Sequence, residues 1–173
     1  AIAFRWRKRR YLGMERGSLE AVVHPALTAF DDLQHAGTQK EAIRRNTEQF
    51  VRGLPANNVL LTGARGTGKS SLIRACLHAF ARDGLRLVEV DKRDLVDLAE
   101  LVALLEGRPE RFIVFCDDLS FDASEAGYKE LKAALDGSVA GRADNVLVYA
   151  TSNRRHLMPE FMRDNLAAEH QDD

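Results

Sequence analysis

A glycine-rich segment of the chain has the composition of a phosphate-binding loop. Residues 63–70 read GARGTGKS and match the pattern G-x-x-x-x-G-K-[ST]. The glycines let successive backbone N–H groups point toward one anion, and a helix that starts after them would add the positive end of its dipole. The lysine would contact the β- and γ-phosphates of a nucleotide, and the serine hydroxyl would bind Mg²⁺. The alternative is a glycine-rich turn that binds nothing.

The placement of this segment favours a nucleotide over a simple turn. It lies directly after a short apolar stretch and directly before an amphipathic one. The segment is not G-x-G-x-x-G, so a dinucleotide-binding fold is disfavoured. We predict that ATP and ADP bind through one continuous run of residues, namely Gly63, Ala64, Arg65, Gly66, Thr67, Gly68, Lys69, Ser70 and Ser71.

Two acidic residues end the most apolar segment of the chain, which reads RFIVFCDD over residues 111–118. The Asp117 carboxylate would hold Mg²⁺, directly or through water, opposite the hydroxyl of Ser70. Asp118 would orient and deprotonate an attacking water. Helix capping or solvation explains such a pair of acids equally well when the pair stands alone. Together with the loop, the pair predicts a metal site formed by Ser70 and Asp117.

A polar residue also ends the last apolar segment, which reads NVLVYATSN over residues 145–153. The side-chain amide of Asn153 would hold the attacking water or contact the γ-phosphate, and an Asx-type turn is the alternative. The predicted catalytic residues are therefore Lys69, Asp118 and Asn153. Three residues that follow are candidates for contacting phosphate, a neighbouring subunit or nucleic acid, unless they are only solvated: Arg154, Arg155 and His156.

The order of apolar and amphipathic segments predicts an α/β fold. Strands are expected over residues 58–63, 85–91, 111–118 and 145–153. Helices are expected over residues 25–53, 70–84, 94–107 and 123–137, with Asp94 opening the third of them. Strands that alternate with helices form a parallel sheet covered on both faces, and ligands bind beyond the carboxyl ends of the strands. The candidate site residues lie at those ends.

The chain has 173 residues and a formal net charge of −1, so one domain is expected and no global charge draws it to nucleic acid. We predict a basic and irregular N-terminal arm over residues 1–24, followed over residues 25–173 by a nucleotide-binding domain that is incomplete at its C-terminus. Basic residues around Trp6 in the arm suit single-stranded nucleic acid by charge and stacking. A solvated terminus or an acidic protein partner is the alternative. The basic residues are Arg5, Arg7, Lys8, Arg9 and Arg10.

The cysteines and the apolar segments indicate the cellular compartment of the protein. Cys76 and Cys116 lie in apolar segments, which fits buried thiols in a reducing cytosol better than a disulfide. No run of 18 apolar residues occurs, and no apolar stretch follows the basic start. These observations predict neither a membrane span nor a secretory signal, so we expect a cytoplasmic protein with no membrane partner.

With these motifs read together, the chain resembles an AAA+ ATPase. Lys69 and Ser70 match its Walker A motif, Asp117 and Asp118 its Walker B motif, and Asn153 its sensor 1. The segment FDDLQHAGTQKEAI looks like the entry segment that borders the adenine. The stretches GLPANNVLLTGARGTGKSSL, FCDDLSF and YATSNRRHLMPEF look more closely like an uncharacterised bacterial family of predicted AAA+ ATPases. This resemblance covers most of residues 26–166.

The resemblance implies a P-loop NTPase three-layer fold, here an AAA+ core without strand five and the helical lid. We identify no arginine finger, so we expect slow hydrolysis by this chain alone. Any homo-oligomer would assemble through the missing C-terminal elements. The implied function is a Mg²⁺-dependent ATPase that couples its nucleotide state to a conformational change on an unidentified protein partner. The alternative is a nucleotide-dependent adaptor or switch with little hydrolysis, associated with nucleic acid. A small-molecule kinase is disfavoured, because no lid residues follow the fourth strand.

Overall fold

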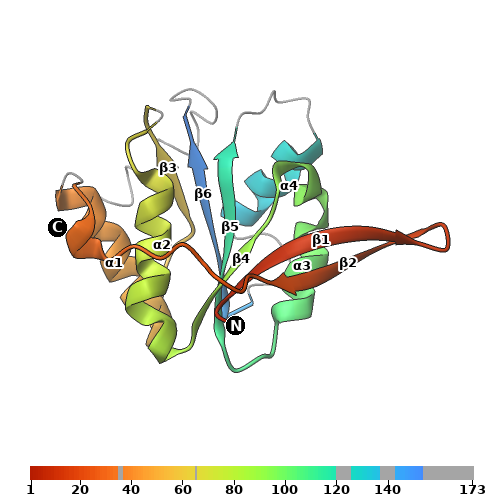
Figure 1. Cartoon of the computed structure of the whole chain (residues 1–173), viewed down its shortest axis with the longest axis horizontal. Coiled ribbons are helices and arrows are strands. Elements are labelled where there is room, and N and C mark those ends of the chain that lie inside the picture. The colour runs from red at the N-terminus through yellow and green to blue at the C-terminus, as the bar shows by residue number, and fades with distance from the viewer. Residues whose placement is uncertain (35–36, 65, 120–125, 137–142, 154–173) are drawn as a thin grey trace.

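The computed structural model describes residues 1–34, 37–64, 66–119, 126–136 and 143–153. These residues form a six-stranded sheet with the strand order β2-β1-β4-β5-β6-β3 (Figure 1). Every neighbouring pair of strands is parallel except β1 and β2, so the predicted mainly parallel sheet is confirmed. The strands are β1 (Ala3–Tyr11), β2 (Met14–Ala21), β3 (Val59–Thr62), β4 (Leu85–Glu89), β5 (Arg111–Leu119) and β6 (Val146–Ser152).

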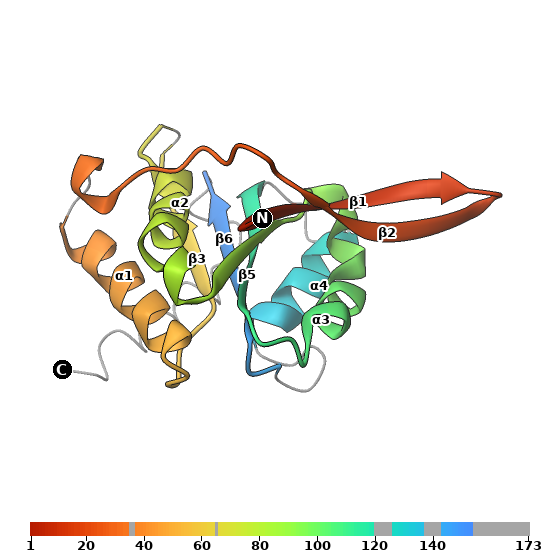
Figure 2. The same cartoon turned by 60° about the horizontal axis from the view of Figure 1, so that its bottom comes forward.

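Helices cover both faces of the sheet and give the fold three layers (Figure 2). One face carries α1 (Gly37–Val51) and α2 (Lys69–Phe80), and the other carries α3 (Leu98–Leu105) and α4 (Ala126–Leu135). None of the helices in the described ranges has the length and apolar character that a membrane span requires. The part of the chain that the structure describes also has three short 3₁₀ turns: η1 (Phe30–Asp32), η2 (Ala81–Asp83) and η3 (Lys92–Asp97).

The central strand β5 shows why its segment is continuously apolar. Ile113 and Phe115 belong to the buried cluster beneath α1 and α2, whereas Phe112, Val114 and Cys116 belong to the cluster beneath α3 and α4. A strand that is covered on both faces needs apolar side chains at odd and even positions alike. The core therefore holds β5 firmly up to the point where its acidic residues begin.

The two cysteines are part of this core. Cys76 and Cys116 are free thiols with no exposed surface, as the sequence predicts. Burial disfavours the charged thiolate and raises the pKa of both thiols to about 12. Both side chains therefore stay protonated at neutral pH and act as small apolar residues.

Buried hydrogen bonds fix α1 against the centre of the sheet. The hydroxyl of Tyr149 on β6 lies 2.8 Å from Thr47 Oγ1 and accepts a 2.9 Å hydrogen bond from Asn46 Nδ2. Asn46 also accepts a hydrogen bond from the backbone N–H of Asn57, just before β3. Burial raises the pKa of Tyr149, so its hydroxyl remains a neutral partner in this network.

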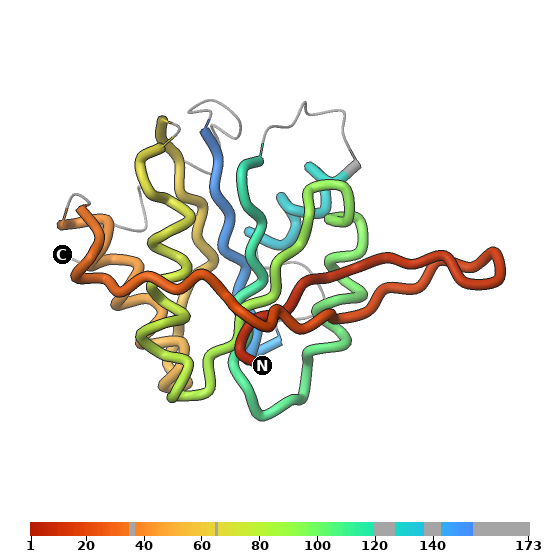
Figure 3. Tube along the Cα trace, viewed as in Figure 1, coloured from red at the N-terminus to blue at the C-terminus, as the bar shows by residue number. Residues whose placement is uncertain are grey.

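Two helix predictions need correction. The helix expected over residues 25–53 begins only at Gly37, because residues 22–29 cross α2 without helical structure (Figure 3). Phe30–Asp32 form only the short η1 turn between the extended residues Ala29 and Leu33, and Phe30 and Leu33 pack against the cluster beneath α1 and α2. The helix expected to open at Asp94 instead begins as the η3 turn, where Asp91 Oδ1 accepts the Arg93 N–H at 2.9 Å. The chain turns directly after β4, so the capping residue lies earlier than predicted.

The irregular backbone expected for the N-terminal arm is also wrong, because the segment forms the β1–β2 hairpin. Ala3–Arg5 pair with Leu87–Glu89, so β1 extends the central sheet. Most of the hairpin is exposed on both faces, and such a ribbon lacks the alternation of apolar and polar residues that marks a strand. The domain boundary after residue 24 stays a prediction.

Trp6 anchors the hairpin to the body of the protein. Its side chain is 2% exposed and packs into the cluster beneath α3 and α4, and its Nε1–H donates to Asp97 at 3.2 Å. A Cβ at Gly17, on the same face of the hairpin, would lie 1.9 Å from the Trp6 ring. The stacking role expected for Trp6 is therefore wrong, since the ring is buried within the protein.

We expect Gly17→Ala to destabilise the base of the hairpin, because the new methyl group needs space that the Trp6 ring occupies. Overpacking of this kind costs about 1–3 kcal/mol. Trp6 is the only tryptophan, so a red-shifted emission and stronger acrylamide quenching would report this site alone. Ser18→Ala, on the opposite face of the ribbon, should leave the emission unchanged. An unaltered spectrum for Gly17→Ala would show that the ring does not lie against Gly17.

Candidate functional site

Most of the predicted site residues surround one cavity of about 280 Å³. The cavity lies where the carboxyl ends of β5 and β6 face the loop between β3 and α2, as the doubly covered sheet predicts. The residues that line it are Gly66, Gly68, Lys69, Ser70, Ser71, Asp117, Asp118, Thr151 and Asn153. The structure therefore brings together residues from three segments that are far apart in the sequence.

The loop depends on glycine at two positions before α2. Gly66 and Gly68 have φ angles of 80° and 82°, in the left-handed region that a side chain disfavours. Gly68 is also the N-cap of α2, so the first turn of this helix starts at the cavity. Backbone N–H groups at a helix start, together with the helix dipole, favour an anion there.

Lys69 is held by the loop itself. Its side chain is nearly buried, and its ammonium group donates to the carbonyl oxygens of Gly63 at 2.9 Å and Ala64 at 2.8 Å. Thr67 Oγ1 donates to the same Ala64 oxygen at 2.9 Å. Gly63, Ala64 and Thr67 thus shape the loop and position Lys69, although none of them lines the cavity. Arg65, the remaining loop residue of the prediction, lies outside the described residues.

Ser70 and Asp117 form the contact between the loop and the sheet. Ser70 Oγ donates to Asp117 Oδ1 at 2.5 Å, which brings the two predicted metal ligands to one point. Mg²⁺ is usually held by one or two protein ligands together with phosphate oxygens and waters. No group of three acidic, histidine or cysteine side chains within the described ranges would hold a metal ion without such help. The donor set therefore fits Mg²⁺ bound together with a phosphate.

A β-bulge explains how two consecutive acids face one cavity. Consecutive side chains of a regular strand point to opposite faces of the sheet. In β5, Cys116 pairs with Ala150 but Leu119 pairs with Ser152, so β5 has one extra residue at this point. Asp118 takes a φ of 55°, a left-handed conformation that aspartate tolerates better than most residues. The bulge turns Asp117 and Asp118 toward the same side.

Thr151, which is not among the predicted site residues, holds the bulge. Its Oγ1 donates to Asp117 Oδ1 at 2.7 Å and accepts the backbone N–H of Asp118 at 2.9 Å. The side chain is 1% exposed. Its place two residues before Asn153, at the end of a buried strand, was the available signal, but threonine is also common in strands for its β-branched shape.

The end of β6 also reaches Asp118. Asn153 Nδ2 donates to Asp118 Oδ1 at 2.6 Å, so the predicted polar residue of β6 lies against the predicted base. This contact orients the Asp118 carboxylate within the cavity. The three basic candidates that follow Asn153 lie outside the described residues.

A comparison with protein-family models assigns the chain to a family. The model described as "Protein of unknown function (DUF815)" matches residues 1–173. The chain belongs to the DUF815 family. The match includes the N-terminal hairpin as well as the cavity residues. A search of curated proteins finds no match.

Solved structures similar to the DUF815 chain are AAA+ ATPases, in agreement with the resemblance seen in the sequence. AMPPCP-bound DnaA from Aquifex aeolicus has a TM-score of 0.52 and 15% identity, over 83% of this chain and 47% of DnaA. PCH-2 from C. elegans has a TM-score of 0.51 and 18% identity, over 73% of this chain and 40% of PCH-2. A chain of the E. coli MS115-1 HORMA:CdnC:Trip13 complex has a TM-score of 0.58 and 13% identity, over 74% of this chain and 59% of the chain in the complex.

These likenesses confirm the fold predicted for the DUF815 chain, an AAA+ P-loop core. The matched part of this chain spans between 40% and 59% of these three structures. Within the described ranges, no further strand pairs with β3 at its edge of the sheet.

Thr151→Val should destabilise the fold, because it leaves the partly buried N–H of Asp118 without its acceptor. An unpaired buried donor costs about 1–3 kcal/mol. Thr151→Ser keeps the hydroxyl and should restore most of the loss, which urea unfolding of the three proteins would measure. If the valine variant, which keeps the methyl group, is as stable as wild type, the hydroxyl bonds are not what holds the bulge.

Proposed function

We propose that the chain binds ATP with Mg²⁺ and hydrolyses it as a cytoplasmic AAA+-type ATPase. The observation that carries this proposal is the 2.5 Å contact between Ser70 of the loop and Asp117 of β5. This contact brings the phosphate loop and the acidic strand end to one cavity, which Lys69 and Asn153 also line. The AMPPCP carried by the similar DnaA structure supports a nucleotide as the ligand.

The proposed roles follow from charge and position. The start of α2 and the Lys69 ammonium would neutralise the phosphates, and Ser70 and Asp117 would hold Mg²⁺. Asp118 would accept the proton of the attacking water, with Asn153 fixing its carboxylate. Phosphoryl transfer needs little covalent help from a protein, so positioning and charge neutralisation would supply most of the catalysis.

A nucleotide-dependent switch with little hydrolysis is the second candidate. The observation that favours it is the 2.6 Å bond between Asn153 and Asp118, because this bond occupies one oxygen of the carboxylate that would serve as the base. In either case we propose that the nucleotide state changes how the chain engages a protein partner. The similar Trip13 structure is a complex with HORMA and CdnC, which supports a protein partner for this fold. Steady-state phosphate release distinguishes the ATPase from the switch.

We expect Lys69→Ala to weaken ATP binding at least tenfold, a loss of about 1.4 kcal/mol, because a charge-assisted contact to the phosphates disappears. Calorimetry with ATP and Mg²⁺ would measure the affinities. Lys129→Ala removes the same charge from the exposed surface of α4 and should leave the affinity unchanged. Equal affinities for wild type and Lys69→Ala would contradict a nucleotide site in this loop.

We expect Asp118→Asn to retain ATP binding and lose hydrolysis. Asparagine tolerates the left-handed backbone of this position and can still accept the Asn153 hydrogen bond, but it cannot act as a base. Phosphate release and calorimetry on the same sample would separate turnover from binding. Wild-type turnover by this variant would exclude Asp118 as the base, whereas no turnover by either protein would favour the switch.

A further inference from the structure

The β1–β2 hairpin projects from the body of the protein as a two-stranded ribbon (Figures 1 and 2). Only Ala3–Arg5 pair with β4, and the rest of β1 pairs with β2 alone. The base is held by the buried Trp6 ring and by an ion pair of 3.0 Å between Lys8 and Asp97. The proposed nucleotide site uses no residue of this ribbon, so its structure calls for a separate explanation.

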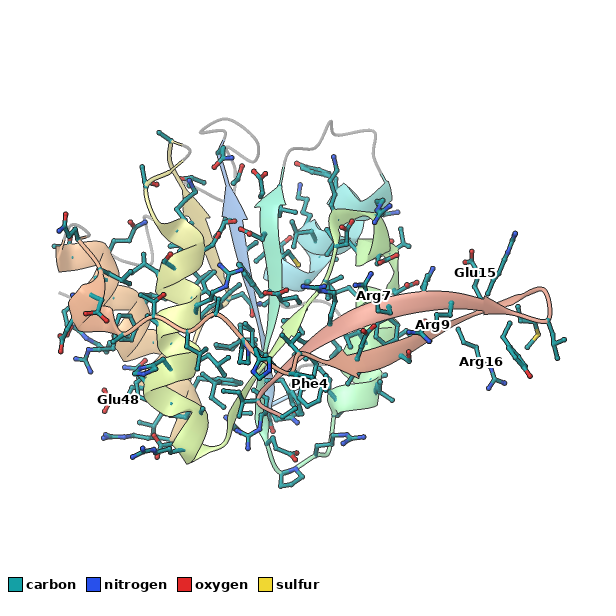
Figure 4. All side chains as sticks on the ribbon, viewed as in Figure 1. Phe4, Arg7, Arg9, Glu15, Arg16 and Glu48 are labelled. Atoms are coloured by element: carbon teal, nitrogen blue, oxygen red, sulfur yellow. The ribbon has the colours of Figure 1, made fainter. Side chains whose placement is uncertain are left out.

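The ribbon carries a row of arginines along one face. Its strands hold six basic residues and two acidic ones, in a chain whose formal net charge is −1. Alternation places Arg5, Arg7 and Arg9 on the same face, and Arg16 pairs across from Arg9. Neighbours in the row are about 6.6 Å apart along the strand. Figure 4 shows Arg7, Arg9 and Arg16 spaced between the body and the turn.

The outer arginines of this row are only weakly satisfied within the chain. In the described ranges, Glu20 is the one acidic residue that forms ion pairs with Arg7, at 3.4 Å, and Arg9, at 3.8 Å. All three side chains are about half exposed or more. Exposed ion pairs of this kind contribute little to stability, so another anion can replace Glu20 at little cost. No ion pair involves Arg16 among the described residues. Arg5, by contrast, is paired with Glu89 of the sheet.

The turn of the ribbon is built at a cost to stability. Leu12 and Gly13 form a two-residue turn with φ angles of 50° and 78°, a conformation that favours asparagine or glycine at both positions. Leu12 is 88% exposed, and its neighbours Tyr11 and Met14 are 72% and 59% exposed. An exposed leucine in left-handed backbone stabilises nothing within the chain. The apolar tip is therefore shaped for a contact outside it.

We propose that this ribbon, residues 6–19, binds duplex nucleic acid, with Arg7, Arg9 and Arg16 on the phosphates and the apolar tip in a groove. A row of charges along the ribbon suits a linear polyanion, whereas a lipid surface at the tip would leave the inner arginines far from the headgroups. The major groove of B-DNA admits a two-stranded β-ribbon, and apolar side chains contact thymine methyl groups there. A single strand binds along a series of stacked aromatic rings, whereas Trp6 is buried here and Tyr11 at the tip is the one exposed ring among residues 6–19.

The proposal is tested by fluorescence anisotropy with a labelled short DNA duplex over a range of salt concentrations. The triple variant Arg7→Gln, Arg9→Gln and Arg16→Gln should bind at least tenfold more weakly at low salt. Its log–log salt slope should be shallower by about 2–3, since each phosphate contact contributes about 0.9. The α1 control is Arg44→Gln and Arg45→Gln on α1 with Arg52→Gln directly after it, which removes the same charge elsewhere and should bind as wild type does.

The variant Leu12→Asn distinguishes the contribution of the tip to binding from its contribution to folding stability. It suits the turn, so the unfolding midpoint should stay or rise, whereas duplex affinity should fall at least threefold. The proposal is overturned if duplex binding ignores the triple variant or falls equally in the α1 control. It is also overturned if a single strand, or vesicles of phosphatidylglycerol and phosphatidylcholine, bind the ribbon in preference to the duplex.

The binding assays contain no nucleotide, and Lys69→Ala should bind the duplex as tightly as wild type. A failure of the ATP proposal therefore leaves this one standing, and duplex binding by itself lends no support to ATPase activity.

Discussion

The candidate site depends on a single irregularity in β5. One extra residue in this strand, opposite Thr151, places Asp117 and Asp118 on the same side of the sheet. The irregularity is stabilised from the neighbouring strand, because the Thr151 hydroxyl bonds to the carboxylate of one aspartate and the backbone of the other. Without the bulge, one acid would face the cavity and the other would face away from it. The contacts to Ser70 and to Asn153 both presuppose this arrangement.

The rest of the fold gives this site a rigid support. β5 is buried on both faces, and the polar network of Asn46, Thr47 and Tyr149 holds α1 against β6. Buried hydrogen bonds of this kind are costly to break, because each leaves an unpaired polar group in the core. The buried parts of β5 and β6 therefore fix the strand ends, and the acidic and amide groups lie at the edge of the sheet.

The two faces of the N-terminal hairpin differ in their contacts with the body of the protein. Trp6 and Lys8 face the body and fix the base of the ribbon. Arg7 and Arg9 alternate with them on the opposite face and stay exposed. Because side chains alternate along a strand, one face of this basic segment packs against the body and the other face is exposed to solvent. A segment that looks uniform in composition consequently has one face that anchors the hairpin and one face that stays exposed.

The central architecture was readable in the sequence. Four apolar segments alternating with helical ones predicted β3, β4, β5 and β6 and a parallel sheet, since burial on both faces requires continuous apolar runs. The spacing of glycines, lysine and serine in residues 63–70 likewise predicted a loop before a helix, because glycine is required by the local backbone conformation of such a loop. The starts of α1 and of η3 were not predicted correctly, since the first depends on how residues 22–33 pack against the core and the second on the capping contact of Asp91.

Tertiary structure alone decided the details that the proposed chemistry needs. The bulge at Asp118 and the part of Thr151 in holding it depend on the register between β5 and β6, which no local pattern encodes. The burial of Trp6 depends on Gly17 and on the η3 turn, both distant from it in the sequence. Residue types therefore determined which groups were available for chemistry. The pairing of strands determined which of those groups face one another, because hydrogen-bond register is a property of two segments at once.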